Sequence, residues 1–221
     1  SVGIYVGALG YGYNTELLKS KGLPVPKSWA DLTKPEYKGE VQIANPNSSG
    51  TAYTTLATIM QILGEDKGWD YMKKLHANVN QYTKSGSAPI KAAARGETTI
   101  GIVFQHDAVK QKKSGLPIAV VSPTEGTGYE VGSMSIIKGA RNMKEAKVFY
   151  DWALSPAAQT LVFNSGQSLQ VPANTKAKGD PDAPVLSQIK LINYDFKTYG
   201  NKDKRGQLLG KWDNDVSNLP R

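Results

Sequence analysis

The sequence predicts an α/β protein with a largely parallel sheet. Short apolar strand patterns alternate with amphipathic helical patterns along the 221 residues, which favours strand–helix–strand units. Three polar segments, 47–51, 85–89 and 105–107, each follow a predicted strand and precede a predicted helix. In open α/β sheets, ligands bind beyond the carboxyl ends of the strands. We therefore expect these three segments to converge on one side of one sheet.

The elements of the first half are predicted from the spacing of apolar residues and from Gly, Pro and Asn residues that mark where elements begin or end. The predicted strands are 4–13, 40–44, 79–82 and 98–104. The predicted helices are 15–19 (capped by Asn14), 27–32, 52–63, the helix after Gly68 that carries Trp69, Met72 and Leu75, and 90–95 (ended by Gly96). Residues 34–39 are predicted to be a loop.

The second half is less regular. Predicted strands cover 118–121 and 129–137, with a Gly-containing loop at 123–128 between them. Helices are predicted at 144–152 and 156–163, the second capped by Ser155. The remainder is predicted to be loop-rich, with one helix at 183–191.

Composition excludes several kinds of site. Without cysteine, the chain forms no disulfide, thiolate metal site or cysteine nucleophile. With two histidines, His76 and His106, a zinc site built mainly from His is not expected, and we predict no metal and no cofactor. No window has the apolar length of a membrane span. The chain opens without a basic start, so we expect that an export signal was removed or not included.

The net charge of +8 raises the question of nucleic-acid binding. The lysines are scattered, however, and only four arginines are present, without an Arg-rich run. We predict no nucleic-acid partner. The charge indicates a solvated basic surface or weak steering of small anions toward a cleft.

Two Ser/Gly turns are the strongest signal for a ligand. Each places hydroxyls and unpaired backbone N–H groups at the positive end of a helix dipole, which is a simple way to bind phosphate or carboxylate. The alternative is that they are ordinary helix caps. The candidate ligand-binding residues are Ser49, Gly50 and Thr51 of the first turn and Ser85, Gly86 and Ser87 of the second.

His106, Asp107 and Glu130 are the other candidate ligand-binding residues. A carboxylate accepts hydrogen bonds from hydroxyls or an amine, and His either donates or accepts them. The alternatives are that Asp107 caps the following helix, that His106 is a partly buried structural histidine, and that Glu130 is a surface carboxylate. His76 lies on a Lys-rich helix. We expect its side chain to face away from that helix, and we assign it no role.

Five segments carry a resemblance to a known family. They are Trp29-Ala30-Asp31-Leu32, Pro35-Glu36-Tyr37-Lys38-Gly39, Ser49-Gly50-Thr51-Ala52-Tyr53, Gly96-Glu97 with Gly101-Ile102, and the helix pair from Lys144 through Ser155-Pro156-Ala157-Ala158-Gln159. Together they resemble the periplasmic solute-binding proteins of ABC importers, in the branch often labelled ferric-iron-binding. The resemblance implies a type II binding protein, with two α/β lobes, a hinge and a ligand in the cleft. It also implies a periplasmic location and an ABC permease in the inner membrane as partner.

The resemblance further implies that the first lobe is incomplete in this chain. Family members begin with several strand–helix units before the segment that matches the first strand here. By resemblance, 1–12 is the crossover strand and part of lobe 1, 13–131 is lobe 2, and 132–221 is the remainder of lobe 1 with the C-terminal helices. The missing N-terminal part of lobe 1 is then expected to carry further ligand contacts.

The choice of ligand rests on one departure from the family. Relatives that bind ferric ion use an adjacent tyrosine pair, and His106-Asp107 stands in its place. Phenolates suit Fe(III) as hard anionic ligands, and both are lost here. With Glu130, the His-Asp pair resembles the sugar-phosphate-binding branch. We therefore expect a phosphorylated sugar or similar organophosphate, with ferric iron and 2-aminoethylphosphonate as alternatives.

An enzyme is the alternative from a different class. His106 and Asp107 would then act as an acid/base pair on a bound phosphate ester. We expect adjacent residues at a strand end to point apart, and the sequence shows no Ser/His/Asp or metal cluster. We predict that the chain is not an enzyme.

Overall fold

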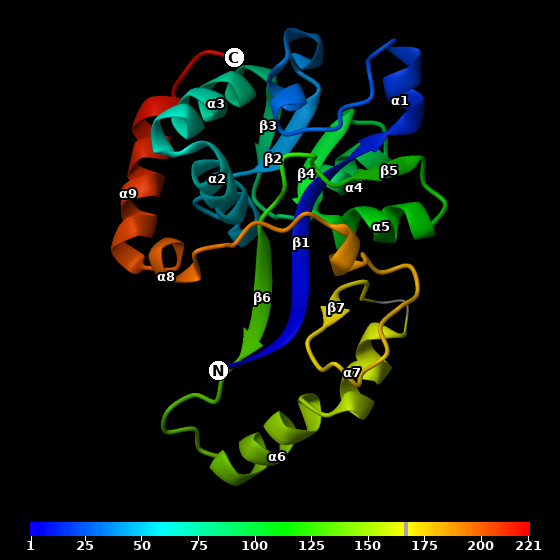
Figure 1. The fold of residues 1–221 in the computed structure, drawn as a ribbon, viewed down its shortest axis with the longest axis vertical. Coiled ribbons are helices and arrows are strands. Elements are labelled where there is room, and N and C mark those ends of the chain that lie inside the picture. The colour runs from blue at the N-terminus through cyan, green and yellow to red at the C-terminus, as the bar shows by residue number, and fades with distance from the viewer. Residues whose placement is uncertain (166–167) are drawn as a thin grey trace.

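A mixed sheet forms the centre of the computed structural model, which describes residues 1–165 and 168–221 (Figure 1). Seven strands pair in it, in the order β3-β2-β4-β1-β5, with β6 and β7 also pairing with β1. The strands are β1 Val2–Asn14, β2 Val41–Ala44, β3 Val79–Thr83, β4 Ile100–Phe104, β5 Ile118–Val121, β6 Tyr129–Met134 and β7 Val171–Pro172. The α/β class is confirmed.

The prediction of a largely parallel sheet is wrong. Strands β2, β3 and β4 are parallel to one another, but β1 is antiparallel to β4, β5, β6 and β7. A buried strand is apolar whichever way it runs, so hydrophobic pattern gives no direction. Strand β1 is also long enough to join two regions: its second part pairs with β4 and β5, and its first part with β6 and β7 (Figure 1).

Helices cover both faces of the β4 region. They are α1 Thr15–Ser20, α2 Gly50–Leu63, α3 Glu65–Asn78, α4 Ala88–Ala94, α5 Gln105–Lys113, α6 Met143–Ala153, α7 Pro156–Phe163, α8 Phe196–Tyr199 and α9 Lys202–Trp212. Ile102 and Phe104 of β4 pack into the larger core with α2 and α3, whereas Val103 packs into a second core with α4 and α5. Because side chains alternate along a strand, β4 is buried on both sides.

Several predicted helix ends are confirmed by their contacts. Asn14 accepts hydrogen bonds from the backbone N–H groups of Glu16 and Leu17 at the start of α1. Ser49 and Ser155 cap α2 and α7 with their hydroxyls. Gly96 follows α4 with a φ of +79°, a left-handed conformation that favours glycine.

Other predicted elements need correction. Helix α3 begins at Glu65, so Gly68 lies inside it. The helix predicted at 27–32 is a 3₁₀ turn, Ala30–Thr33. The loop predicted at 34–39 contains a second 3₁₀ turn, Pro35–Tyr37. The helix predicted at 183–191 is only a 3₁₀ turn, Leu186–Gln188. Helices α8 and α9, followed by a π turn at 213–217, were not predicted. Helix α9 buries only Leu208 and Trp212, too few apolar positions for a recognisable stripe.

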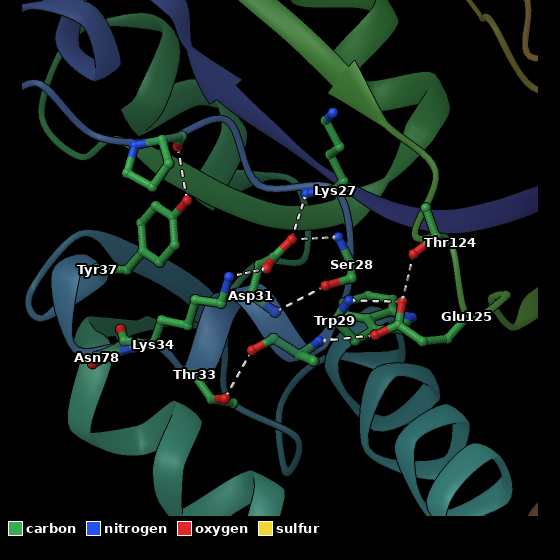
Figure 2. Close-up of polar contacts among 12 residues, drawn as sticks. Lys27, Ser28, Trp29, Asp31, Thr33, Lys34, Tyr37, Asn78, Thr124 and Glu125 are labelled. Atoms are coloured by element: carbon green, nitrogen blue, oxygen red, sulfur yellow. Dashed lines mark hydrogen bonds and ion pairs between the residues drawn. The ribbon is translucent and has the colours of Figure 1, made fainter.

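Two carboxylates fasten the loop before β2 (Figure 2). Asp31 accepts hydrogen bonds from the backbone N–H groups of Lys27 and Ser28 and pairs with Lys34 at 2.7 Å. Burial raises the pKa of Asp31, but these contacts outweigh it and lower the pKa to about 2. Glu125 accepts from the backbone N–H groups of Trp29 and Ala30 at 3.0 and 2.9 Å. The loop is thereby tied to the segment that leads into β6 and Glu130.

His76 does not face away from its helix toward solvent, contrary to the sequence-based expectation. It is 1% exposed, and its ring nitrogens lie 2.9 Å from the Tyr82 hydroxyl and 2.9 Å from the Leu219 carbonyl oxygen. The histidine therefore joins α3 to the C-terminal segment and has a structural role. Among the described residues, no helix combines the length and apolar character that a bilayer crossing requires.

Candidate functional site

The two Ser/Gly turns lie against each other. Strands β2 and β3 are parallel neighbours, with Ala44 opposite Thr83, so the turns that follow them leave the same edge of the sheet. The Ser48 hydroxyl donates to the Lys84 carbonyl oxygen at 3.1 Å. A β-carbon at Gly86 would overlap the Thr51 side chain and lie 2.9 Å from the Ser49 hydroxyl oxygen. Glycine at 86 is what permits this approach.

Each turn leaves polar groups available. The first N–H groups of an α-helix have no intrahelical acceptor. Ser49 uses its hydroxyl to accept from the backbone N–H of Ala52 at 3.4 Å, but Ser87 makes no capping hydrogen bond to α4. Gly50, the first residue of α2, is exposed, and nothing lies within 4 Å of where its β-carbon would be. An anion can therefore approach the backbone of α2 at this residue.

His106 and Asp107 occupy the same edge. Strand β4 is parallel to β2, so its carboxyl end lies on the side of the two Ser/Gly turns. Both residues belong to the first turn of α5, which begins at Gln105 with Phe104 as its uncapped N-cap residue. The interpretation of Asp107 as the helix cap is therefore wrong, because the helix starts two residues earlier.

The His106 ring is packed between two strands, and one of its nitrogens makes no hydrogen bond to the described residues. It stacks on Phe104, with 5.6 Å between ring centroids and 9° between planes, and Gly7 leaves room for it on the other strand. Its Nδ1 is buried and has no hydrogen-bond partner among the described residues. Burial lowers the pKa of His106, so the neutral ring is favoured. The described part of the chain thus leaves this nitrogen as a buried polar atom without a partner, facing the backbone of β1 at Gly7.

Asp107 lies close to His106, and its carboxyl is partly buried. His106 Nε2 and Asp107 Oδ2 are 3.9 Å apart, so the two side chains do not point apart as expected. The distance is nevertheless beyond a hydrogen bond and does not form a proton relay. Burial raises the pKa of Asp107, opposed by the charges of His106, Lys91 and Lys110.

Glu130 approaches from a different strand. It lies on β6 opposite Gly7 of β1, and its Oε1 accepts a hydrogen bond from the Tyr5 hydroxyl at 3.1 Å. Burial raises the pKa of Glu130, the Tyr5 hydrogen bond lowers it, and the negative charge of Asp107 raises it. Burial and Glu130 raise the pKa of Tyr5, and the negative charge of Asp107 raises it further.

A cavity of about 600 Å³ joins the first Ser/Gly turn to Glu130. Gly50 and Glu130 both line it. Ser49 and Thr51 flank Gly50 in the chain, and the contact of Gly86 with Thr51 brings the second turn beside them. Among the described residues, Gly50 and Glu130 are thus the predicted site residues that line the cavity, whereas His106, Asp107 and the second turn are not part of its lining.

The sequence analysis missed three contributors to this region. Tyr5 holds Glu130, and Arg205 of α9 lines the cavity with its guanidinium 4.8 Å from the centre of the Tyr53 ring. An aromatic cluster completes the lining, formed by Tyr129, Tyr194 and Phe196 with centroids 4.7 to 6.2 Å apart. Arg205 and the aromatic residues of the tail lie in the part of the chain with the weakest periodicity, so no local signal marked them.

No group of three or more His, Asp or Glu residues suited to hold a metal ion occurs within 1–165 and 168–221. The residues present are hydrogen-bonding groups: N–H donors and hydroxyls at one end, and an imidazole with two carboxyls at the other. Donors of this kind suit an anion, and the imidazole and carboxyls suit hydroxyl groups.

One family model matches most of the chain. The family described as "Bacterial extracellular solute-binding protein" matches residues 1–198. An uncharacterized protein of Haemophilus influenzae is 53% identical over 214 residues, which cover 96% of this chain and 62% of that protein. The chain thus spans less than two thirds of the length of this curated relative.

Two solved structures share the fold over nearly the whole chain. The periplasmic binding protein AfuA from Actinobacillus pleuropneumoniae, solved with exogenous fructose-6-phosphate bound, is 51% identical with a TM-score of 0.94. The match covers 98% of this chain and 68% of AfuA. The periplasmic binding protein P5PA is 40% identical with a TM-score of 0.91, and the match covers 97% of this chain and 68% of P5PA.

Proposed function

This chain belongs to the bacterial extracellular solute-binding protein family, and from that premise we propose that it binds a phosphorylated sugar or similar organophosphate for an ABC importer. It has the α/β fold of type II periplasmic binding proteins. One observation carries the choice of ligand: two Ser/Gly turns in contact with each other share a sheet edge with an imidazole and two carboxyls. The fructose-6-phosphate bound to AfuA supports the same ligand class.

The phosphate would bind at the Ser/Gly turns. Its oxygens would accept from the backbone N–H groups of Gly50 and Thr51 and from the hydroxyls of Thr51 and Ser87. A hydrogen bond to a charged group contributes about 1.5–3 kcal/mol. Four such bonds are of the size that micromolar affinity needs, about 8 kcal/mol before ordering costs. Arg205 lines the same cavity and would add an attractive charge.

The sugar would bind between the carboxyls and the aromatic cluster. Asp107 and Glu130 would accept from hydroxyls, and neutral His106 would donate or accept through its other ring nitrogen, Nε2. Sugar rings present C–H faces that pack on aromatic rings such as Tyr129. A ligand without hydroxyls would leave these buried groups unpaired, which penalises it.

The wider arrangement is also part of the proposal. Residues 13–131 would form one lobe, and 1–12 with 132–221 part of the other, with hinge closure trapping the ligand. Helix α6 supports an incomplete second body, because it buries no residue and exposes Val148, Phe149 and Trp152 by 66%, 59% and 50%. Further chain of the longer relatives would cover this face. The protein would be periplasmic, deliver its ligand to an inner-membrane permease and catalyse no reaction.

Isothermal titration calorimetry tests the ligand class. Glucose 6-phosphate, fructose 6-phosphate, inorganic phosphate, 2-aminoethylphosphonate and Fe(III) are titrated into the same protein. We expect the hexose phosphates to bind at least tenfold more tightly than inorganic phosphate, and Asp107→Asn to remove most of that preference. Asp70→Asn, an exposed change on α3, is the matched control. Tight Fe(III) binding with a visible tyrosinate band, or a preference for the phosphonate, would replace the proposal.

A further inference from the structure

The Tyr5 side chain packs against the opposite strand at a glycine. Tyr5 on β1 lies opposite Gly132 on β6. A β-carbon at Gly132 would overlap ring atoms of Tyr5, including Cε1 and Cζ. The ring therefore occupies the space that any other residue at 132 would fill. With the ring seated there, its hydroxyl reaches Glu130, two residues along the same strand, at 3.1 Å.

A negative charge and a neutral hydrogen-bond donor act on Glu130 from different elements. Burial raises the pKa of Glu130, and the negative charge of Asp107 on α5 raises it further. The Tyr5 hydroxyl donates a hydrogen bond to the Glu130 carboxylate. Burial, followed by the charge and hydrogen bond of Glu130, raises the pKa of Tyr5 to about 12, with a further increment from Asp107. The phenol therefore keeps its proton across the neutral range and remains a donor.

We propose that Tyr5 is a positioning residue that fixes the Glu130 carboxylate for ligand selection. Its hydroxyl binds Oε1, which leaves Oε2 to accept from a ligand hydroxyl in the cavity that Glu130 lines. A carboxylate held in one orientation loses less side-chain freedom when the ligand binds. This inference rests on the proposed function, because it assigns Tyr5 to the sugar end of that site and leaves the phosphate end unaffected.

The test is Tyr5→Phe, which keeps the ring on Gly132 and removes only the hydroxyl. We expect the affinity for glucose 6-phosphate to fall roughly five- to twentyfold, which corresponds to about 1–2 kcal/mol and therefore to the lower end of what one hydrogen bond to a charged group contributes. The affinity for inorganic phosphate should change less than about twofold. Tyr150→Phe is the matched control, because the Tyr150 hydroxyl donates to a backbone carbonyl, that of Met134, at 3.3 Å.

Two further measurements separate positioning from a general structural effect. In a Glu130→Gln background, Tyr5→Phe should have less than half its effect on the glucose 6-phosphate affinity, because the two residues act as a unit. Carbon-13 NMR titration of the Glu130 carboxyl, without ligand, should show a higher pKa in Tyr5→Phe than in the unaltered protein. The charged carboxylate has then lost its donor.

The outcomes distinguish this inference from the proposed function. If the unaltered protein prefers glucose 6-phosphate to inorganic phosphate and Tyr5→Phe keeps that preference, the role of Tyr5 is refuted and the proposed function stands. An equal loss with and without Glu130 also refutes it, since Tyr5 would act by itself. A protein that binds neither compound refutes the proposed function first, and the selectivity role with it.

Discussion

Gly86 packs against Thr51 so closely that a β-carbon at position 86 would overlap the threonine side chain. The same β-carbon would lie 2.9 Å from the Ser49 hydroxyl oxygen. This contact joins two turns that follow parallel strands and makes one polar surface from two helix starts.

Gly86→Ala should separate the two turns. The new methyl group meets Thr51, and overpacking of this kind costs about 1–3 kcal/mol. We expect a matching loss in the free energy of unfolding, measured by urea titration, and at least a tenfold loss of affinity for glucose 6-phosphate. Gly210→Ala is the control, because its β-carbon meets open space in α9 and alanine there favours the helix. Equal effects at both positions would show that the contact between the turns does not matter.

Asp107→Asn should weaken ligand binding without destabilising the fold. Burial raises the pKa of Asp107, so the folded protein holds this proton more tightly than the unfolded chain does. Stability then falls as pH rises from the ordinary carboxyl pKa through the raised one, and the penalty is complete above it. Asparagine removes this penalty.

The expected difference has a sign that urea unfolding can check. At about pH 7, Asp107→Asn should be at least as stable as the unaltered protein, and this advantage should disappear at about pH 3, where both states are protonated. A variant that is less stable at neutral pH would mean that the carboxylate is satisfied in the absence of ligand.

Lys113→Met should release the segment around Asp180. Lys113 Nζ lies 2.7 Å from Asp180 Oδ1 and 2.8 Å from Asp182 Oδ2, and Asp180 is buried. The hydrogen bond from Lys113 lowers the pKa of Asp180, so this contribution to stability is present above the ordinary carboxyl pKa and is lost as pH falls through the lowered one.

Limited trypsin digestion measures that release. Cleavage after Lys176 and Lys178 should become several-fold faster in Lys113→Met at neutral pH and remain unchanged in the control Lys112→Met, which alters an exposed lysine of the same helix. Equal cleavage rates in all three proteins would show that other contacts hold the segment.

Polar substitution of the α6 face should change surface behaviour and leave stability intact. Phe149 and Trp152 pack on each other with ring centroids 5.5 Å apart. Phe149 is 59% exposed and Trp152 is 50% exposed. Phe149→Gln with Trp152→Gln should reduce binding of an apolar dye several-fold, with less than about 0.5 kcal/mol change in the free energy of unfolding. Val185→Gln, at an exposed apolar residue outside this helix, should have little effect on either. A large loss of stability would mean that the face is already packed.

The elements with strong local signals could be predicted from sequence. Asn14, Ser49 and Ser155 each placed a helix start, because a cap side chain satisfies N–H groups within three residues of itself. Strand β4 was predicted at 98–104, and the structure has it at Ile100–Phe104. The candidate site residues followed from the same local chemistry: Ser and Gly before a helix, and carboxyls at strand ends.

The tail shows where that approach fails. Arg205 and the aromatic residues Tyr194 and Phe196 reach the cavity from a region with weak periodicity. Helix α9 buries two side chains, and its Lys204 and Arg205 contact Glu65 and Tyr53, which lie far earlier in the chain. Spacing along the chain encodes none of these contacts. His106 and Asp107 were placed on the right strand but as residues ahead of a helix, whereas they lie inside its first turn.

The sequence by itself determined the caps, the alternation of strands and helices, and the chemical character of the two Ser/Gly turns, since each depends on residues a few positions apart. Only the tertiary structure decided that β1 runs against its neighbours, that Gly86 meets Thr51, and that Tyr5 holds Glu130. Those relations join segments far apart in the chain. Strand direction and cross-strand contact are fixed by packing of the whole sheet, on which local propensity has no bearing.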